Sequence, residues 1–357
     1  MLPAASPRTH LRHIALYLLI SLAACLLLVA CDRNPLVRQE SYVFGTRVEV
    51  LSAGVAEQQA QDALAAVLRE FDRIHQTYHA WQPSQLTAVT AACQSGKPLQ
   101  VTAEMAGLIR ASQDFAQRSK QLFEPAIGKL IELWGFHADT FTPRLPADSE
   151  IKALLAAHPQ VAQISFAGNT LQCHNPAIAL DLGGIAKGWA LDQAAAILHA
   201  HGVHNALINI GGNVMALGKK GDQPWQVGIQ DPRGSGAIAS LSLYDGEAVG
   251  TSGDYQRFFE LGGQRYSHLI DPRSGRPAEG TEAVTVLVTP RAHAGMLSDV
   301  TSKPVFLGGA DGWRAMAQRM DIQHVLRVDG TGRIQVTQAM QARLRWSEGR
   351  HADEVVN

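Results

Sequence analysis

A strand-like run that turns into a helix at two glycines constrains the fold of this chain more than any other feature. Residues 178–182 are mostly aliphatic, the glycine pair 183–184 interrupts them, and apolar residues then recur at helical spacing until Gly202. A helix that begins this way presents unpaired backbone N–H groups and a partial positive charge. With Lys187 in the first turn and Asp181 at the strand end, the unit predicts a site for a phosphate or another anion.

Residues 1–30 have the pattern of a secretory signal peptide. Basic residues precede an apolar segment, residues 14–30, and small residues lie before Cys31. Polar residues follow Cys31 whereas an apolar run follows Cys25, so Cys31 is the predicted site of lipidation. An uncleaved membrane anchor is the alternative, because a segment of this length can span a bilayer. Asp32 resembles an inner-membrane retention signal, and we expect an inner-membrane lipoprotein that faces the periplasm.

The mature chain is long enough to bury a large core. We expect a tether at residues 31–40, a folded domain at 41–346 and a polar tail at 347–357. The net charge of −1, without a cluster of Lys and Arg, argues against a nucleic-acid partner. We expect Cys93 and Cys173 to be two buried free thiols, although an oxidising compartment permits a disulfide between them.

Hydrophobic spacing predicts long helices mixed with strands that hairpins connect, which is typical of the α+β class. Helices are expected from about residue 60 to 78, from an N-cap at Thr102, after the loop at 123–128, and over 151–157. Strands are expected at 41–51, 206–210, 225–230, 239–244 and 282–289.

A histidine and a carboxylate precede a Pro/Gly turn in the C-terminal half. His268 and Asp271 are three residues apart, so both can reach one cleft. Imidazole is the usual proton carrier near neutral pH, and a carboxylate can orient it. We predict that His268 is a general base and that Asp271 is its orienter or an alternate base. A histidine that only satisfies a turn carbonyl is the alternative.

Three loops resemble ligand-binding motifs. Residues 251–255 fit either ligand contacts or an Asx-type turn. Residues 298–302 offer oxygen ligands suited to Mg²⁺, or a helix cap at Ser298 or Asp299. Residues 234–239 match the dinucleotide fingerprint but lead into a strand, which favours an ordinary hairpin loop.

Several ordered segments together resemble the ApbE family, the FAD:protein FMN transferases, a group that includes NosX-like proteins. These segments are Phe44-Gly45-Thr46, 123–136, 181–192, 209–213, 251–255 and 266–272. The similarity runs from residue 44 to about residue 309. It implies an α+β, bilobal ApbE-like fold, with mostly antiparallel sheets flanked by helices and a ligand cleft between the lobes.

The resemblance implies a Mg²⁺-dependent enzyme that transfers FMN from FAD to a Ser or Thr hydroxyl of a partner protein. FMN would be attached through a phosphodiester bond and AMP would leave. The expected acceptor is a flavoprotein, a membrane-associated redox subunit, and the lipid anchor would hold the enzyme at the same membrane. Two alternatives remain: an FAD pyrophosphatase that gives FMN and AMP, and a non-enzymatic flavin-binding lipoprotein.

The resemblance also implies a set of site residues. FAD would be bound by Phe44, Tyr78, Leu122, Phe123, Glu124, Asp181, Lys187 and the backbone at Ile270. Mg²⁺ would lie between the backbone carbonyl near Gly184 and the carboxylate of Asp299. Four residues after this aspartate the family usually has threonine, whereas this chain has Lys303, which is no magnesium ligand. The neighbouring Ser302 is the hydroxyl that could substitute.

Overall fold

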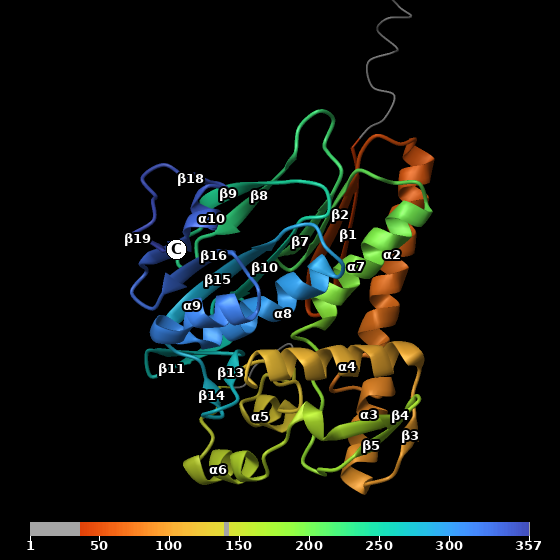
Figure 1. The fold of residues 1–357 in the computed structure, drawn as a ribbon, viewed down its shortest axis with the longest axis vertical. Coiled ribbons are helices and arrows are strands. Elements are labelled where there is room, and N and C mark those ends of the chain that lie inside the picture. The colour runs from red at the N-terminus through yellow and green to blue at the C-terminus, as the bar shows by residue number, and fades with distance from the viewer. Residues whose placement is uncertain (1–35, 139–142, 357) are drawn as a thin grey trace, which may run out of the picture.

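The structure is a computed structural model that describes residues 36–138 and 143–356, and it has two lobes (Figure 1). The predicted leader, with Cys25 and the lipidation site Cys31, lies outside these residues. None of the helices within 36–138 and 143–356 has the length and the hydropathy needed to cross a bilayer.

A nine-stranded sheet forms the centre of the upper lobe (Figure 1). Every neighbouring pair in it is antiparallel except the last, in which β17 and β19 run parallel. In spatial order the strands are β1 (Val37–Val43), β2 (Thr46–Ser52), β6 (Ala206–Ile210), β7 (Asn213–Leu217), β10 (Ala248–Gly253), β15 (Thr281–Val288), β16 (His324–Asp329), β17 (Ile334–Thr337) and β19 (Glu354–Val356).

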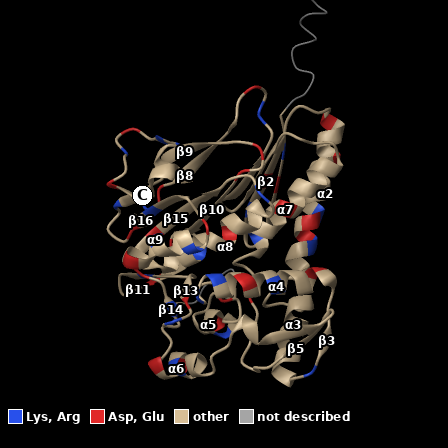
Figure 2. Cartoon of the chain, in the orientation of Figure 1, with Lys and Arg blue, Asp and Glu red and all other residues tan. Residues whose placement is uncertain are grey.

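Four helices lie along one side of this sheet: α2 (Glu57–Thr77), α7 (Ala186–Ala200), α8 (Ala294–Leu307) and α9 (Gly309–Arg319). The inner side of α2 is apolar at helical spacing, and Leu64, Phe71 and Ile74 are fully buried. Its outer side carries charges of both signs (Figure 2). Amphipathic spacing therefore places α2 against the core, as the sequence predicts.

A smaller sheet contributes to a second core on the other side of the large sheet. It contains β8 (Trp225–Gln230), β9 (Ala237–Leu243) and β18 (Leu344–Trp346), and the short helix α10 (Gln338–Gln341) lies nearby. Trp225 is buried and donates a hydrogen bond from Nε1 to the carbonyl of Leu217 at 2.9 Å. Residues 231–236 connect β8 to β9, and 237–239 are the first residues of β9, so the hairpin interpretation of the 234–239 segment is confirmed.

The lower lobe is mainly helical (Figure 1). Its elements are α3 (Gln85–Ser95), α4 (Ala103–Arg118), α5 (Gly128–Leu133), α6 (Asp148–Ala156), a 3₁₀ turn (Val161–Gln163) and the sheet of β3 (Leu99–Gln100), β5 (Thr170–Cys173) and β4 (Ile164–Ala167). The hydroxyl of Thr102 accepts a hydrogen bond from the N–H of Met105 at 3.1 Å, so the predicted N-cap of α4 is confirmed.

Two hairpins reach from the upper lobe to α5 and α6. They are β11 (Phe258–Leu261) with β12 (Gln264–Ser267), and β13 (Ile270–Asp271) with β14 (Arg276–Pro277). The rings of Phe136 and Phe259 stack at 5.6 Å, and Trp134 Nε1 donates to the carbonyl of Gly275 at 2.8 Å. These contacts fix the lower lobe to the hairpins that carry the 266–272 segment.

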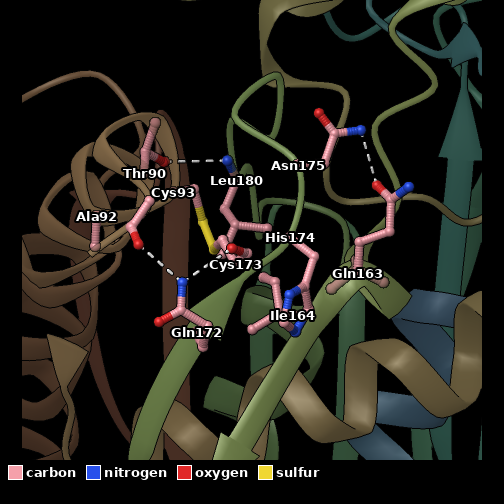
Figure 3. The surroundings of a disulfide bond; sticks show 12 residues. Thr90, Ala92, Cys93, Gln163, Ile164, Gln172, Cys173, His174, Asn175 and Leu180 are labelled. Carbon is pink, nitrogen blue, oxygen red and sulfur yellow. Dashed lines mark hydrogen bonds between the residues drawn. A yellow bond between two sulfur atoms is a disulfide. The ribbon is translucent and has the colours of Figure 1, made fainter. Parts of the chain in front are cut away.

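Cys93 of α3 and Cys173 of β5 form a disulfide, with a Cα–Cα distance of 4.8 Å (Figure 3). Beside it, the N–H of Leu180 donates to the hydroxyl of Thr90 at 3.2 Å. The preference for two free thiols is therefore wrong. The sequence does not show that α3 lies against β5, because the two cysteines are 80 residues apart.

Three predicted boundaries are corrected. Residues 37–40, which the expected tether includes, belong to β1, which pairs with β2. The tail expected at 347–357 joins the large sheet through β19. Helix α8 begins at Ala294, so Ser298 and Asp299 lie inside it and are not its caps.

Candidate active site

A cavity of about 1220 Å³ lies where the large sheet, α7, α8 and the lower lobe meet. Most of the predicted site residues line it. They are Phe44, Tyr78, Leu122, Phe123, Glu124, Asp181, Gly184, Lys187, His268, Ile270 and Asp299. Asp271 and Ser302 are not among the residues that line it.

The predicted anion-binding turn opens onto this cavity. Asp181 Oδ1 accepts a hydrogen bond from the N–H of Gly183 at 2.7 Å, and Lys187 Nζ donates to the carbonyl of Gly183 at 3.1 Å. Burial raises the pKa of the Asp181 carboxyl, while the Gly183 N–H and the Arg257 and Lys187 charges act in the other direction. Helix α7 begins at Ala186, and Gly184, Ala186 and Lys187 line the cavity, so the positive end of the helix and the Lys187 ammonium both face it.

Aromatic side chains line another part of the cavity. Phe44 has a φ of 58° in the β1–β2 turn, and its ring contacts that of Phe71 edge-on at 5.9 Å. The hydroxyl of Tyr78 donates to Glu104 Oε1 at 2.7 Å. Phe123 is 5% exposed, and a Cβ added at Gly184 would lie 3.1 Å from its ring. These rings offer flat apolar contact to a planar ligand.

Glu124 is a buried carboxyl that lines the cavity. Its Oε1 accepts hydrogen bonds from the N–H of Ala126 at 3.1 Å and of Val161 at 2.9 Å. Its Oε2 is buried without a hydrogen-bond partner among the described residues. Burial raises the pKa of Glu124 to about 7, although the two backbone N–H groups oppose the shift. Glu124 therefore both ties the lower lobe together and presents a carboxyl to the cavity.

His268 is held by one ring nitrogen. Its Nδ1 lies 3.1 Å from the carbonyl oxygen of Arg257. A proton on Nδ1 makes this contact a hydrogen bond and leaves Nε2 as an acceptor. Burial, together with the charges of Arg257 and Lys187, lowers the pKa of His268 to about 3. The imidazole is therefore neutral at pH 7, and in the ligand-free cavity it is a weaker proton acceptor than an ordinary histidine.

The structure does not bring Asp271 to His268. Both carboxylate oxygens of Asp271 contact the guanidinium of Arg273, at distances of 2.7–3.1 Å, and Oδ1 also accepts from the Arg273 N–H. Since the carbonyl of Arg257 holds His268, the geometry does not support Asp271 as its orienter. The short spacing in sequence does not bring the two side chains together, because the Asp271 carboxylate pairs with Arg273 within the β13–β14 hairpin.

Asp299 is fixed within α8 by contacts from α7. Its Oδ2 accepts a hydrogen bond from the N–H of Gly188 at 2.8 Å, and the residue has no exposed surface. Asp192 of α7 caps the start of α8, because its two oxygens accept from the N–H groups of Gly295 and Met296, both at 2.9 Å. The two helices are thus joined through carboxylate-to-backbone hydrogen bonds.

Lys303 lies next to Asp299 on α8 and also lines the cavity. Its Nζ is 2.5 Å from Asp299 Oδ1 and 2.8 Å from the Asp299 carbonyl oxygen. Burial would raise the pKa of Asp299, but the Lys303 and Lys187 charges and the hydrogen bonds outweigh it and lower the pKa. Asp299 is therefore a carboxylate paired with an ammonium.

The predicted magnesium ligands do not form a set that fits Mg²⁺. Both Asp299 carboxylate oxygens are already in contact with N–H donors. The Ser302 hydroxyl is fully buried, lies 2.7 Å from Ser252 Oγ and donates to the Asp299 carbonyl at 2.8 Å. Mg²⁺ requires near-octahedral oxygen ligands, and an ammonium beside the carboxylate opposes it. Ser302 therefore does not replace the missing threonine.

Sequence reasoning did not identify Arg257. Its side chain lines the cavity, and Nη2 donates to the carbonyls of Phe136 and Ala138 at 3.1 Å each. Its position between the 251–255 and 266–272 segments was the available signal. In the first of these segments Thr251 and Ser252 line the cavity.

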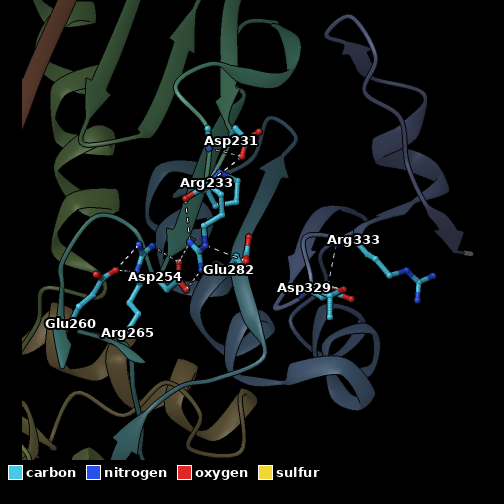
Figure 4. Close-up of polar contacts among 11 residues, drawn as sticks. Asp231, Arg233, Asp254, Glu260, Arg265, Glu282, Asp329 and Arg333 are labelled. Carbon is cyan, nitrogen blue, oxygen red and sulfur yellow. Dashed lines mark hydrogen bonds and ion pairs between the residues drawn. The ribbon is translucent and has the colours of Figure 1, made fainter. Parts of the chain in front are cut away.

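Asp254 belongs to a charged cluster outside the cavity lining (Figure 4). Its carboxylate accepts two hydrogen bonds from Arg233, both at 2.7 Å, and Arg233 Nε lies 3.2 Å from Glu282. Asp254 therefore supports the strand end through an ion pair and does not coordinate a cavity ligand.

The comparisons with known proteins agree on one family. The model of the ApbE family matches residues 44–326. The chain is 42% identical over 315 residues to an FAD:protein FMN transferase of Rhodobacter capsulatus, a match that covers 88% of this chain and 60% of that relative. The match thus spans less than two thirds of this relative's length. A Vibrio cholerae FAD:protein FMN transferase is 30% identical over 277 residues, with 75% of this chain and 82% of that relative covered.

Solved structures confirm the fold. The crystal structure of the ApbE protein of Thermotoga maritima superposes with a TM-score of 0.79 and 30% sequence identity, and the match covers 87% of this chain and 100% of that one. The mostly antiparallel α+β architecture expected from the sequence is therefore confirmed.

Proposed function

Because the chain belongs to the ApbE family, we propose that it is an FAD:protein FMN transferase. FMN passes from FAD to a Ser or Thr hydroxyl of an acceptor protein, where a phosphodiester bond holds it, and AMP leaves. One observation carries this proposal: a single cavity is lined by the aromatic side chains, by the anion-binding turn with Lys187, and by His268.

FAD binding uses the aromatic side chains and the adjoining glycine turn of this cavity. The isoalloxazine ring packs against the side chains of Phe44, Tyr78 and Phe123. The diphosphate lies at the 183–184 turn, where the N-terminus of α7 and the Lys187 ammonium attract negative charge. This placement leaves the FMN phosphorus within the cavity that His268 also lines.

The transfer is a displacement at phosphorus. The acceptor oxygen forms a bond to the FMN phosphorus while the bond from that phosphorus to the bridging anhydride oxygen breaks. AMP leaves with the bridging oxygen and the bonding electron pair. The hydroxyl proton moves to Nε2 of His268, which is unprotonated because Nδ1–H faces the Arg257 carbonyl. Positive groups beside the anhydride stabilise the charge that develops on the leaving oxygen.

The acceptor is a membrane-associated redox subunit, and the enzyme acts on the periplasmic side of the inner membrane. Support comes from the N-terminal sequence alone: an apolar segment followed by Cys31 and polar residues fits a lipid anchor. A diacylglycerol on the Cys31 thiol would keep the enzyme close to a client in the same membrane.

The test incubates the purified protein with FAD and detergent-solubilised membrane proteins of the organism that encodes it. Flavin fluorescence that survives denaturing electrophoresis, with release of AMP, supports the transferase. Free FMN and AMP without covalent flavin would indicate a pyrophosphatase. Bound FAD that stays intact would indicate a flavin-binding lipoprotein.

A further inference from the structure

We infer that the ammonium of Lys303 is the resident cation of this active site, and that it stands where a divalent ion would otherwise face the FAD diphosphate. Flavin transfer by this chain then needs no added metal ion. The inference rests on the proposed function, because it concerns how the same cavity neutralises the phosphates.

The side chain of Lys303 fills the space between the two predicted metal-binding positions. Its Cδ and Cε lie 3.3 Å from where a Cβ on Gly184 would be. Its Nζ contacts the Asp299 carboxylate at 2.5 Å. The lysine thus reaches from the glycine turn to the aspartate, which is the interval that the resemblance assigns to Mg²⁺.

Lys303 still has hydrogen-bonding capacity for a ligand. An ammonium carries three N–H donors, and two of them are accounted for by the carbonyl and the carboxylate of Asp299. Its side chain is 15% exposed and lines the cavity. The third donor can therefore meet a phosphate oxygen, since lysine binds phosphate as a compact point charge.

Lys303 and Lys187 together supply two positive charges to the same cavity. The Asp299 carboxylate offsets one of these charges, and the Arg257 guanidinium, which also lines the cavity, supplies another, so the two negative charges of the FAD diphosphate can be balanced without a metal ion. During transfer, Lys303 stabilises the negative charge on the phosphates by hydrogen bonding and by charge. The bonds that form and break stay as described above, and no proton passes through either lysine.

The rest of the site favours the lysine over a metal ion. The Asp299 Oδ2 is held by the Gly188 N–H, and Ser302 Oγ faces Ser252, so neither is free to complete an oxygen shell. A metal ion could bind only if Lys303 moved away from a carboxylate that has 1% of its side chain exposed. If Lys303 stayed in place, its ammonium would repel the metal ion.

Two measurements on the wild-type protein test the inference. The first titrates Mn²⁺ into metal-free protein, with and without FAD, and follows bound Mn²⁺ by electron paramagnetic resonance. The second measures FAD affinity and AMP release in EDTA and in Mg²⁺. We expect no stoichiometric Mn²⁺ site, and less than a twofold effect of EDTA on either quantity. A stoichiometric Mn²⁺ site, or a tenfold loss of AMP release in EDTA, would overturn the inference.

Variants of Lys303 test the role of its charge directly. Lys303→Met should weaken FAD binding in EDTA at least tenfold, while Lys303→Arg keeps the charge and should stay within threefold. Lys303→Thr replaces the ammonium by a hydroxyl and frees Asp299, so it should bind Mn²⁺. Lys219→Met removes an exposed lysine outside the cavity and should behave as wild type. If Lys303→Met binds FAD with the same affinity as Lys219→Met, the inference is wrong.

Different experimental results would contradict the inference and the proposed function. If the protein neither releases AMP nor labels an acceptor under any condition, the transferase proposal is wrong, whereas the Mn²⁺ and FAD-binding measurements still decide the role of Lys303. If transfer occurs only with Mg²⁺, the transferase stands and the inference is wrong.

Discussion

The backbone N–H of Gly188 donates a hydrogen bond to the carboxylate of Asp299 at 2.8 Å, and this contact joins α7 to α8 directly beneath the cavity. The two helices approach so closely that a Cβ on Gly188 would lie 2.4 Å from the carbonyl oxygen of Gly295 and 2.5 Å from the Cβ of Asp299. Glycine is required here for space, because both neighbours belong to the other helix.

We predict that Gly188→Ala destabilises the protein by about 2–4 kcal/mol, since the methyl group forces the helices apart and disrupts the bond to Asp299. Urea unfolding followed by circular dichroism measures the change. Gly107→Ala is the matched control, because Gly107 is an exposed residue of α4 and a Cβ there meets nothing within 4 Å. The control should gain about 0.5–1 kcal/mol. Equal stability of the two variants would contradict the close approach.

Local patterns in the sequence were sufficient to predict much of the fold. The strands predicted at 206–210 and 225–230 have the observed bounds of β6 and β8, because alternating burial and flanking turns are local signals. The N-cap at Thr102 and the glycine turn before α7 were found for the same reason. Each of these features depends on residues that are close together in the sequence.

Features that depend on distant residues could not be predicted. Helix α8 starts four residues before Ser298 because Asp192, about a hundred residues earlier, caps it. Strand β19 is ordered by its parallel partner β17, although its own sequence looks like a polar tail. The disulfide between Cys93 and Cys173 joins α3 to β5 across 80 residues. Tertiary packing, which is absent from local spacing, decides all three.

His268→Ala should reduce the rate of FMN transfer by about 10²- to 10⁴-fold, which is the usual contribution of a positioned general base. FAD affinity should change little, because the proposed proton comes from the acceptor hydroxyl and not from FAD. Stopped-time assays of covalent flavin and a separate FAD-binding titration distinguish the two quantities. His351→Ala, which changes an exposed histidine outside the cavity, serves as the control. A full transfer rate in His268→Ala with normal FAD binding would remove His268 from the mechanism.

Glu124 should make the stability of the protein depend on pH. Burial raises its folded-state pKa to about 7 from an ordinary value of 4.5. The folded state therefore holds a proton that the unfolded state loses between pH 4.5 and 7, so this group's contribution to the free energy of unfolding is largest below pH 4.5 and falls as the pH rises to about 7.

Glu124→Gln should remove this pH dependence. The amide oxygen can keep the hydrogen bonds from the N–H groups of Ala126 and Val161, while no buried charge remains above pH 7. Relative to wild type, the variant should gain on the order of 2–3 kcal/mol between pH 5 and pH 8. Urea unfolding at both pH values measures this gain. Parallel stability curves for the two proteins would show that the carboxyl is not buried as described.

The disulfide between Cys93 and Cys173 should contribute substantially to stability, because it links residues 80 apart in the sequence. A crosslink over such a loop restricts the unfolded chain and typically contributes about 2–5 kcal/mol. We predict that the double variant Cys93→Ala and Cys173→Ala loses stability in this range in urea unfolding. Wild type in excess reductant should unfold at nearly the same urea concentration as the variant, which separates loss of the bond from loss of side-chain packing. Two reactive thiols in unreduced, denatured mature protein, counted beside any lipidated cysteine, would show that the bond does not form.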